Sequence, residues 1–109
     1  MPKFAFTVAR NEDTTPLSPF FGKADWLLIV DPTTGRKSYI ANRGWTSDWV
    51  CTTALAHAVD GLACAYIDTA ALRRLTEAGV EVRLASCARP ATELVDEFAR
   101  LPLADGGVV

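Results

Sequence analysis

Three cysteines and one histidine are the residues of this chain that could bind a soft metal. Cys51 stands in the first turn of an expected helix, where the helix dipole lowers the pKa of a thiol, and Cys87 stands in an expected loop. Thiolates hold iron–sulfur clusters and other soft metals. We therefore take Cys51 and Cys87 as candidate metal ligands, with packing as the alternative for each. Cys64 lies inside an apolar run and is assigned to the core.

The single histidine, His57, follows Cys51 by six residues on the same expected helix. At about 100° per residue, these two side chains point to largely opposite sides of that helix. No two cysteines are separated by two residues, so neither a zinc ribbon nor a redox pair is indicated. His57 is therefore expected to be solvated or to face a partner.

The acidic residues give little support for an enzyme. Asp31 ends an apolar run and introduces a turn with Pro32, which is a structural role for aspartate. No nucleophile is paired with a base, and we expect a protein that is not an enzyme. The residues considered for acid–base catalysis or magnesium binding are Asp13, Asp25, Asp31 and Asp68.

Composition limits the classes of partner and the cellular location. The chain has 109 residues, of which 50% are apolar, and a net charge of −2 without a dense basic cluster. We therefore expect one domain over residues 1–109, with a core at about 3–101 and a frayed tail at 104–109. Nucleic acid is not an expected partner, because phosphate binding needs concentrated basic charge. No apolar run is long enough to span a membrane, and we expect a cytoplasmic protein.

The candidate residues must be positioned by a sheet. Residues 26–30 are apolar without alternation and predict a strand that is buried on both faces. A loop that contains Pro19 and Gly22 precedes this strand. Residues 3–9 and 62–67 predict further interior strands, and residues 36–42 and 80–84 predict more exposed ones. A turn with Gly35 closes the hairpin between the second and third strands.

Three helices are predicted between and after these strands. The first covers about 49–59 after a cap at Ser47 or Asp48, and the second covers 70–78 after a cap at Asp68 or Thr69. Gly79 suits the left-handed position that follows a helix. Pro90 opens a third helix that Pro102 stops. The order β-β-β-α-β-α-β-α predicts an α/β fold, a mixed five-stranded sheet with helices on its faces.

Loops that follow the parallel strands should meet at one edge of this sheet, where α/β proteins bind ligands. Aromatic side chains in or beside this crevice either cap the core or form an apolar pocket or partner surface. Lys23 and Arg43, with Arg10, could offer positive charge to an anion there, although surface cations are usually solvated. The aromatic residues concerned are Phe20, Phe21, Trp45 and Trp49.

The loop and the strand after it resemble the dinitrogenase iron–molybdenum cofactor biosynthesis family. That pattern is Ser-x-His-Phe-Gly-Arg-Ala followed by an apolar strand that ends in Asp. Residues 71–72 and 78–80 fit the family's later Ala-Leu and Ala-Gly-Val in order and spacing. The resemblance spans residues 3–101 and implies a small ribonuclease H-like fold. The matching loop here is Ser18, Pro19, Phe20, Phe21, Gly22, Lys23 and Ala24.

The resemblance implies a non-catalytic protein that binds or carries an iron–molybdenum or other metal–sulfur cluster, with a cluster donor or acceptor protein as partner. Phe20 replaces the family's histidine, and Asp68 stands where the family has glycine before the second helix. The alternative is an interaction or regulatory module that has lost the cluster site and binds a partner through its loop aromatics. The implied cluster-contacting residues are Ser18, Phe20, Phe21, Gly22, Lys23, Ala24 and Arg43, with Cys87 and Cys51 as metal ligands.

Overall fold

A five-stranded mixed sheet forms the centre of the protein in a computed structural model that describes residues 2–104. The strand order is β3-β2-β1-β4-β5, and β2 runs antiparallel to both of its neighbours while β4 runs parallel to β1 and β5. The predicted mixed α/β sheet is therefore confirmed. The strands are β1 (Phe4–Val8), β2 (Trp26–Asp31), β3 (Arg36–Ala41), β4 (Gly61–Cys64) and β5 (Glu81–Leu84).

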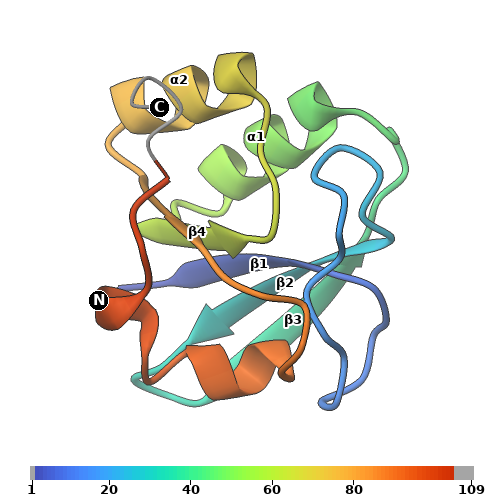
Figure 1. Cartoon of the computed structure of the whole chain (residues 1–109), viewed down its shortest axis with the longest axis vertical. Coiled ribbons are helices and arrows are strands. Elements are labelled where there is room, and N and C mark those ends of the chain that lie inside the picture. Colours follow the sequence, from blue (N-terminus) through green and yellow to red (C-terminus); the bar gives the residue numbers. More distant parts are fainter. Residues whose placement is uncertain (1, 105–109) are drawn as a thin grey trace.

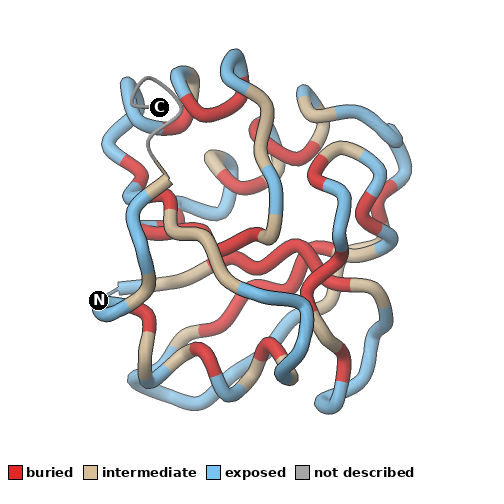
Figure 2. The backbone as a smooth tube through the Cα atoms, viewed as in Figure 1, coloured by how far each residue is buried: buried red, intermediate tan, exposed pale blue. Residues whose placement is uncertain are grey.

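Both α-helices cover the same face of this sheet (Figure 1). Helix α1 (Ser47–Ala56) and helix α2 (Thr69–Glu77) pack over a core of alternate strand residues, which includes Leu27, Leu62 and Val82. The intervening strand residues point to a second core on the other face. Figure 2 shows the buried residues concentrated along the central strands β1, β2 and β4 and on the inner sides of the helices.

Side-chain caps begin both helices. The Asp68 carboxylate accepts the Ala71 N–H at 3.1 Å, as predicted for this residue. Thr46 caps α1 by accepting the Trp49 N–H, so the predicted cap at Ser47 or Asp48 is wrong by one residue. Gly79 has a φ of +88° after α2, which confirms its predicted left-handed conformation.

The predicted third helix is wrong. Two short 3₁₀ turns, Ala91–Leu94 and Phe98–Arg100, take its place on the sheet face opposite α1 and α2. Tertiary contacts explain the difference, because the Phe98 ring stacks on Phe4 at 4.3 Å between centroids and Arg83 holds the Leu101 carbonyl at 2.6 Å. These contacts hold Phe98 and Leu101 in positions that one continuous helix would not give them.

Two further segments differ from expectation. Strand β4 ends at Cys64 instead of continuing to Ile67, because the chain turns there toward the Asp68 cap. Ala104 donates its N–H to the Val82 carbonyl at 2.9 Å, so the predicted fraying does not begin at this residue. Residues 105–109 of the predicted tail lie outside the described residues. Within residues 2–104, no helix is both long and apolar enough to cross a membrane.

Candidate functional site

Three loops meet at the edge of the sheet where the parallel strands β1 and β4 end. The register pairs Val8 at the end of β1 with Trp26, and Trp26 with Ala41, so the chain after β3 leaves from the same edge. The predicted crevice edge is thus where residues 9–25, 42–46 and 65–68 come together.

The loop at 18–24 is fixed to the rest of the protein by its backbone. Ser18 is buried, its N–H donates to the Thr7 carbonyl at 2.8 Å, and its hydroxyl accepts the Phe20 N–H at 3.1 Å. Phe21 and Ala24 are buried in the core. A Cβ on Gly22 would lie 2.6 Å from the Ser47 nitrogen, so only glycine allows this approach to the start of α1.

Asn42 joins this loop to the loop that follows β3. Its side-chain Nδ2 donates to the carbonyls of Gly22 and Ala24 at 2.9 and 2.8 Å. Its Oδ1 accepts the N–H groups of Gly44 and Trp45 at 3.2 and 2.8 Å. The residue is buried, and one amide therefore ties both walls of the site together. The sequence analysis missed it, although an asparagine between a strand and Gly44 is a signal for a side-chain-stabilised turn.

An open, mostly apolar pocket of about 380 Å³ lies between these loops. Phe20, Trp45 and Tyr66 line it and are 58%, 52% and 59% exposed. Trp45 has a φ of +54°, a conformation that is uncommon for a bulky residue and marks strain at functional positions. Tyr66 is a second residue that the sequence analysis missed, because it was placed inside a strand.

The aromatic residues considered from the sequence divide into two groups. Phe21 is buried, and Trp49 is half-buried and packs against the same core, so both cap the core. Phe20 and Trp45 are exposed beside the pocket. The structure therefore brings together two of these four aromatic side chains as a solvent-facing surface, with Tyr66 as a third member.

Charge at the pocket is mixed. Lys23 lines it and is exposed, and Arg43 is exposed on the neighbouring loop. Asp68 also lines the pocket, where its carboxylate accepts the Ser47 hydroxyl at 2.7 Å as well as the Ala71 N–H. The carboxylate thereby occupies the helix N-terminus that could otherwise attract an anion.

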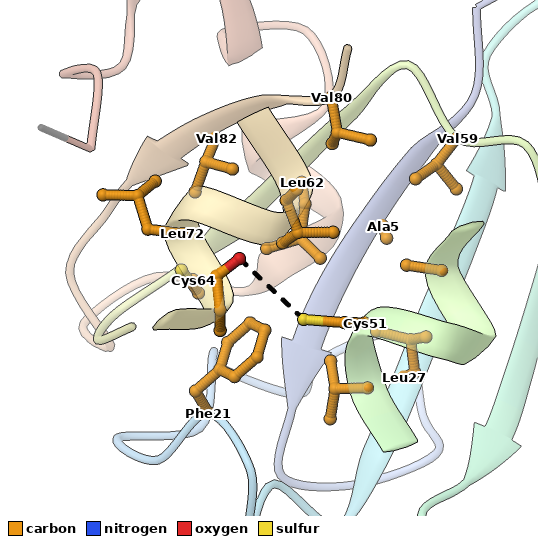
Figure 3. Packing of buried hydrophobic residues seen from close by; sticks show 14 of the residues in the cluster. Ala5, Phe21, Leu27, Cys51, Val59, Leu62, Cys64, Leu72, Val80 and Val82 are labelled. Atoms are coloured by element: carbon orange, nitrogen blue, oxygen red, sulfur yellow. Dashed lines mark hydrogen bonds between the residues drawn. The ribbon is translucent and has the colours of Figure 1, made fainter. Parts of the chain in front are cut away.

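Cys51 lies in the core between α1 and α2 (Figure 3). Its Sγ is 3.9 Å from the Ala71 carbonyl oxygen. Burial raises the pKa of the Cys51 thiol to about 11, against a smaller lowering by Arg74, so the expected lowering at the helix start does not occur. This environment favours the packing interpretation of Cys51. Cys64 is buried too, as predicted, and burial raises its pKa to about 12.

Cys87 is exposed in the loop after β5. Within residues 2–104, no three histidine, cysteine or acidic side chains form a group that could hold a metal ion. A joint ligand role for Cys51 and Cys87 therefore remains a prediction.

The loop that contains Cys87 also borders an apolar pocket of about 410 Å³, which is lined in part by Ser86 and Arg89. Arg89 forms ion pairs with Glu93 and Glu97 there, which lowers the pKa of Glu97.

Comparison with known proteins identifies the family. The family model for the dinitrogenase iron-molybdenum cofactor matches residues 2–101. This chain belongs to that family. A comparison of this chain with curated proteins gave no match.

Two solved structures have the fold of this family member. The apo form of the orange protein from Desulfovibrio gigas superposes with a TM-score of 0.85 at 20% identity, over 95% of this chain and 93% of that one. A putative NifB protein from Thermotoga gives a TM-score of 0.78 at 20% identity, over 100% of this chain and 97% of that one. At such identities the likeness shows a shared fold.

Proposed function

We propose that this protein is a non-catalytic carrier of a metal–sulfur cluster of the iron–molybdenum type. The cluster is its cargo, which it would receive from and pass to donor or acceptor proteins in the cytoplasm, without nucleic acid or membrane as partner. Membership of the dinitrogenase iron-molybdenum cofactor family is the observation that carries this proposal. We also propose a ribonuclease H-like classification for the 3-2-1-4-5 sheet, in which β2 is the strand antiparallel to its neighbours.

The loop at 18–24 is the proposed docking surface for the cluster. Its backbone is held by Ser18 and Asn42, so it offers a preformed wall instead of a mobile segment. The open pocket beside it has a mostly apolar lining, and Lys23 and Arg43 lie near it with charge suited to an anionic cluster. The exposed residues proposed to contact the cluster are Phe20, Lys23 and Arg43, while buried Ser18, Phe21 and Ala24, together with Gly22, would set the shape of the loop.

Cys87 is the proposed thiolate ligand, because it is exposed and soft metals prefer sulfur. Cys51 is a weaker candidate, since metal binding requires a thiolate and burial raises its pKa to about 11. A role for Cys51 would require the contact between α1 and α2 to open. Cys51 and Cys87 therefore give different expected outcomes when each is replaced.

A second candidate function is an interaction module that lacks a cluster and binds a protein partner. The exposed aromatic surface of Phe20, Trp45 and Tyr66 favours it, because aromatic residues are enriched in the energetic centres of protein interfaces. The left-handed backbone at Trp45 supports the same view, since strained conformations of bulky residues concentrate at functional sites.

Retention of a cluster by the purified protein tests the first proposal. Anaerobic protein is mixed with a molybdenum–sulfur or iron–sulfur cluster, desalted, and assayed by visible absorption and metal analysis. We expect stoichiometric retention that falls in Cys87→Ala and persists in the matched variant Cys64→Ala, whose thiol is buried. No retention, under conditions in which a histidine-containing relative binds, refutes the carrier function.

Phe20→His separates the two candidate functions. The Phe20 side chain is largely exposed, so the substitution leaves the core intact while it supplies the imidazole of the family pattern. Increased retention in this variant shows that the pocket is a cluster site. Retention that is absent from both the native protein and the variant leaves the interaction module as the supported function.

A further inference from the structure

A second pocket, of about 350 Å³, lies on the helix-covered face of the sheet at the edge opposite the candidate cluster site. It is formed by Lys3 before β1, by the β2–β3 hairpin, and by His57 at the end of α1. The pairing of Asp31 with Arg36 marks this edge, whereas Trp26 pairs with Ala41 at the other. Trp26 and Asp31 stand five positions apart along β2, which separates the two edges by roughly 16 Å.

Basic side chains from three separate elements line this pocket. They are Lys3, Arg36 and His57, and one carboxylate, Asp31, lies with them. Among the lining residues, Lys3 and Arg36 carry one more charge than Asp31, and the nearby Asp60 carboxylate accepts the Lys3 backbone N–H at 2.9 Å. The Asp31 carboxylate is engaged by its own turn, where its Oδ1 accepts the Thr33 N–H at 3.0 Å.

The two permanent cations of this pocket, Lys3 and Arg36, make few other contacts in the described part of the chain. The Arg36 guanidinium forms no hydrogen bond or ion pair within residues 2–104, and only the backbone N–H of Arg36 has a partner, the Thr34 hydroxyl oxygen at 3.2 Å. The Lys3 Nζ has one long contact, 3.4 Å to the His57 carbonyl at the end of α1. This contrasts with Arg74 and Arg83, which are each paired with a carboxylate.

Neutral hydrogen-bond donors complete the lining. Thr34 and Ser38 place hydroxyl groups on the pocket beside the cations. Because the Thr34 oxygen accepts the Arg36 N–H, its hydroxyl proton is free to point elsewhere. Buried Ile29 supplies an apolar part of the lining. Guanidinium, ammonium and hydroxyl groups that approach from several sides suit a ligand with several terminal oxygens.

We propose that this pocket binds a tetrahedral oxyanion, such as the phosphate group of a small ligand. Arg36 supplies the paired N–H donors, Lys3 a second charge, and Ser38 a neutral hydrogen bond. The site is separate from the cluster pocket and does not depend on the carrier function.

Amide chemical-shift titration with inorganic phosphate, at fixed ionic strength, tests this site. We expect saturable shifts at Lys3, at 34–38 and at His57, with a dissociation constant on the order of 1 mM or tighter. A parallel titration with phenyl phosphate distinguishes free phosphate from the phosphate of an organic ligand, because additional shifts near Ile29 are expected only for the latter.

Arg36→Gln and Lys23→Gln are matched variants that each remove one exposed cation, at opposite edges of the sheet. Arg36→Gln should weaken phosphate binding at least about tenfold, since it removes a charge-assisted pair of hydrogen bonds, while Lys23→Gln should leave it unchanged. Equal weakening in both variants, shifts that do not saturate, or shifts that lie mainly at residues 18–24 each overturn the proposal. Within the described residues 2–104 the Arg36 side chain has no partner to lose, so denaturant unfolding of Arg36→Gln should match the native protein and confirm that it folds.

Discussion

Asn42 should carry a large share of the stability of the two loops that form the candidate cluster pocket. Asn42→Ala removes four hydrogen bonds, two donated to the carbonyls of Gly22 and Ala24 and two accepted from the N–H groups of Gly44 and Trp45. A typical hydrogen bond contributes about 1 kcal/mol net, and a buried group left without a partner costs about 1–3 kcal/mol. Water can reach the more exposed partners, so we expect a loss of about 2–4 kcal/mol.

Thermal and urea unfolding measure this loss. For a domain of about 100 residues, each kcal/mol lowers Tm by roughly 4–8 °C, which predicts a decrease of about 10–20 °C in Asn42→Ala. Asn11→Ala is the matched control, because Asn11 is exposed and its replacement should change stability by less than about 0.5 kcal/mol. Hydrogen exchange at the Trp45 amide should accelerate in Asn42→Ala, since its acceptor is removed.

Asn42→Asp provides a stricter test of the same geometry. The variant keeps the oxygen that accepts both N–H groups but points a second oxygen at two carbonyl oxygens, so it should be at least as unstable as Asn42→Ala at neutral pH. These carbonyls raise the pKa of the introduced carboxyl, and stability should therefore be lost as the pH rises through that folded-state pKa. If Asn42→Ala unfolds within about 0.5 kcal/mol of the native protein, the reasoning on this residue is refuted.

Three further predictions concern the thiols and the loop. In the native protein Cys87 alone should react quickly with a thiol reagent, while Cys51 and Cys64 react only after unfolding, because both are buried; fast loss of two thiols in Cys87→Ser contradicts this. An unfolded thiol ionises at about pH 8.5, so these buried thiols should not affect the free energy of unfolding at lower pH. Above that pH the free energy of unfolding should fall as the pH rises toward their folded pKa values of about 11 and 12. The double replacement of Cys51 and Cys64 by alanine should flatten that slope, and an unchanged slope excludes the thiols as its cause. Gly22→Ala should lose about 1–3 kcal/mol in urea unfolding, because its Cβ would lie 2.6 Å from the Ser47 nitrogen; native stability in this variant would contradict the close approach.

Features with a local cause could be predicted from the sequence. Asp68 caps α2 through a contact three residues away, and Gly79 takes a left-handed conformation that its missing Cβ permits. The buried strand β2 follows from its uninterrupted apolar run. The loop at 18–24 was identified by its family pattern, and the structure places it at the predicted edge.

Features with long-range causes could not. The role of Asn42 depends on carbonyls 18 and 20 residues earlier in the chain, and no spacing rule connects them. The segment after Pro90 has helical apolar spacing, yet stacking of Phe98 on Phe4 fixes it as 3₁₀ turns. Tyr66 lies in the apolar run 62–67, and its exposure follows only from the early end of β4 at Cys64.

The location of a retained cluster tests the central claim most directly. Amide spectra of the protein would be compared before and after anaerobic loading with a metal–sulfur cluster. The carrier account predicts that shifts or broadening concentrate at residues 18–24, 43–47 and 66–68, where the loops line one pocket, and around Cys87, the proposed thiolate ligand. Changes centred on Arg36 and His57, or no changes at all, would contradict it.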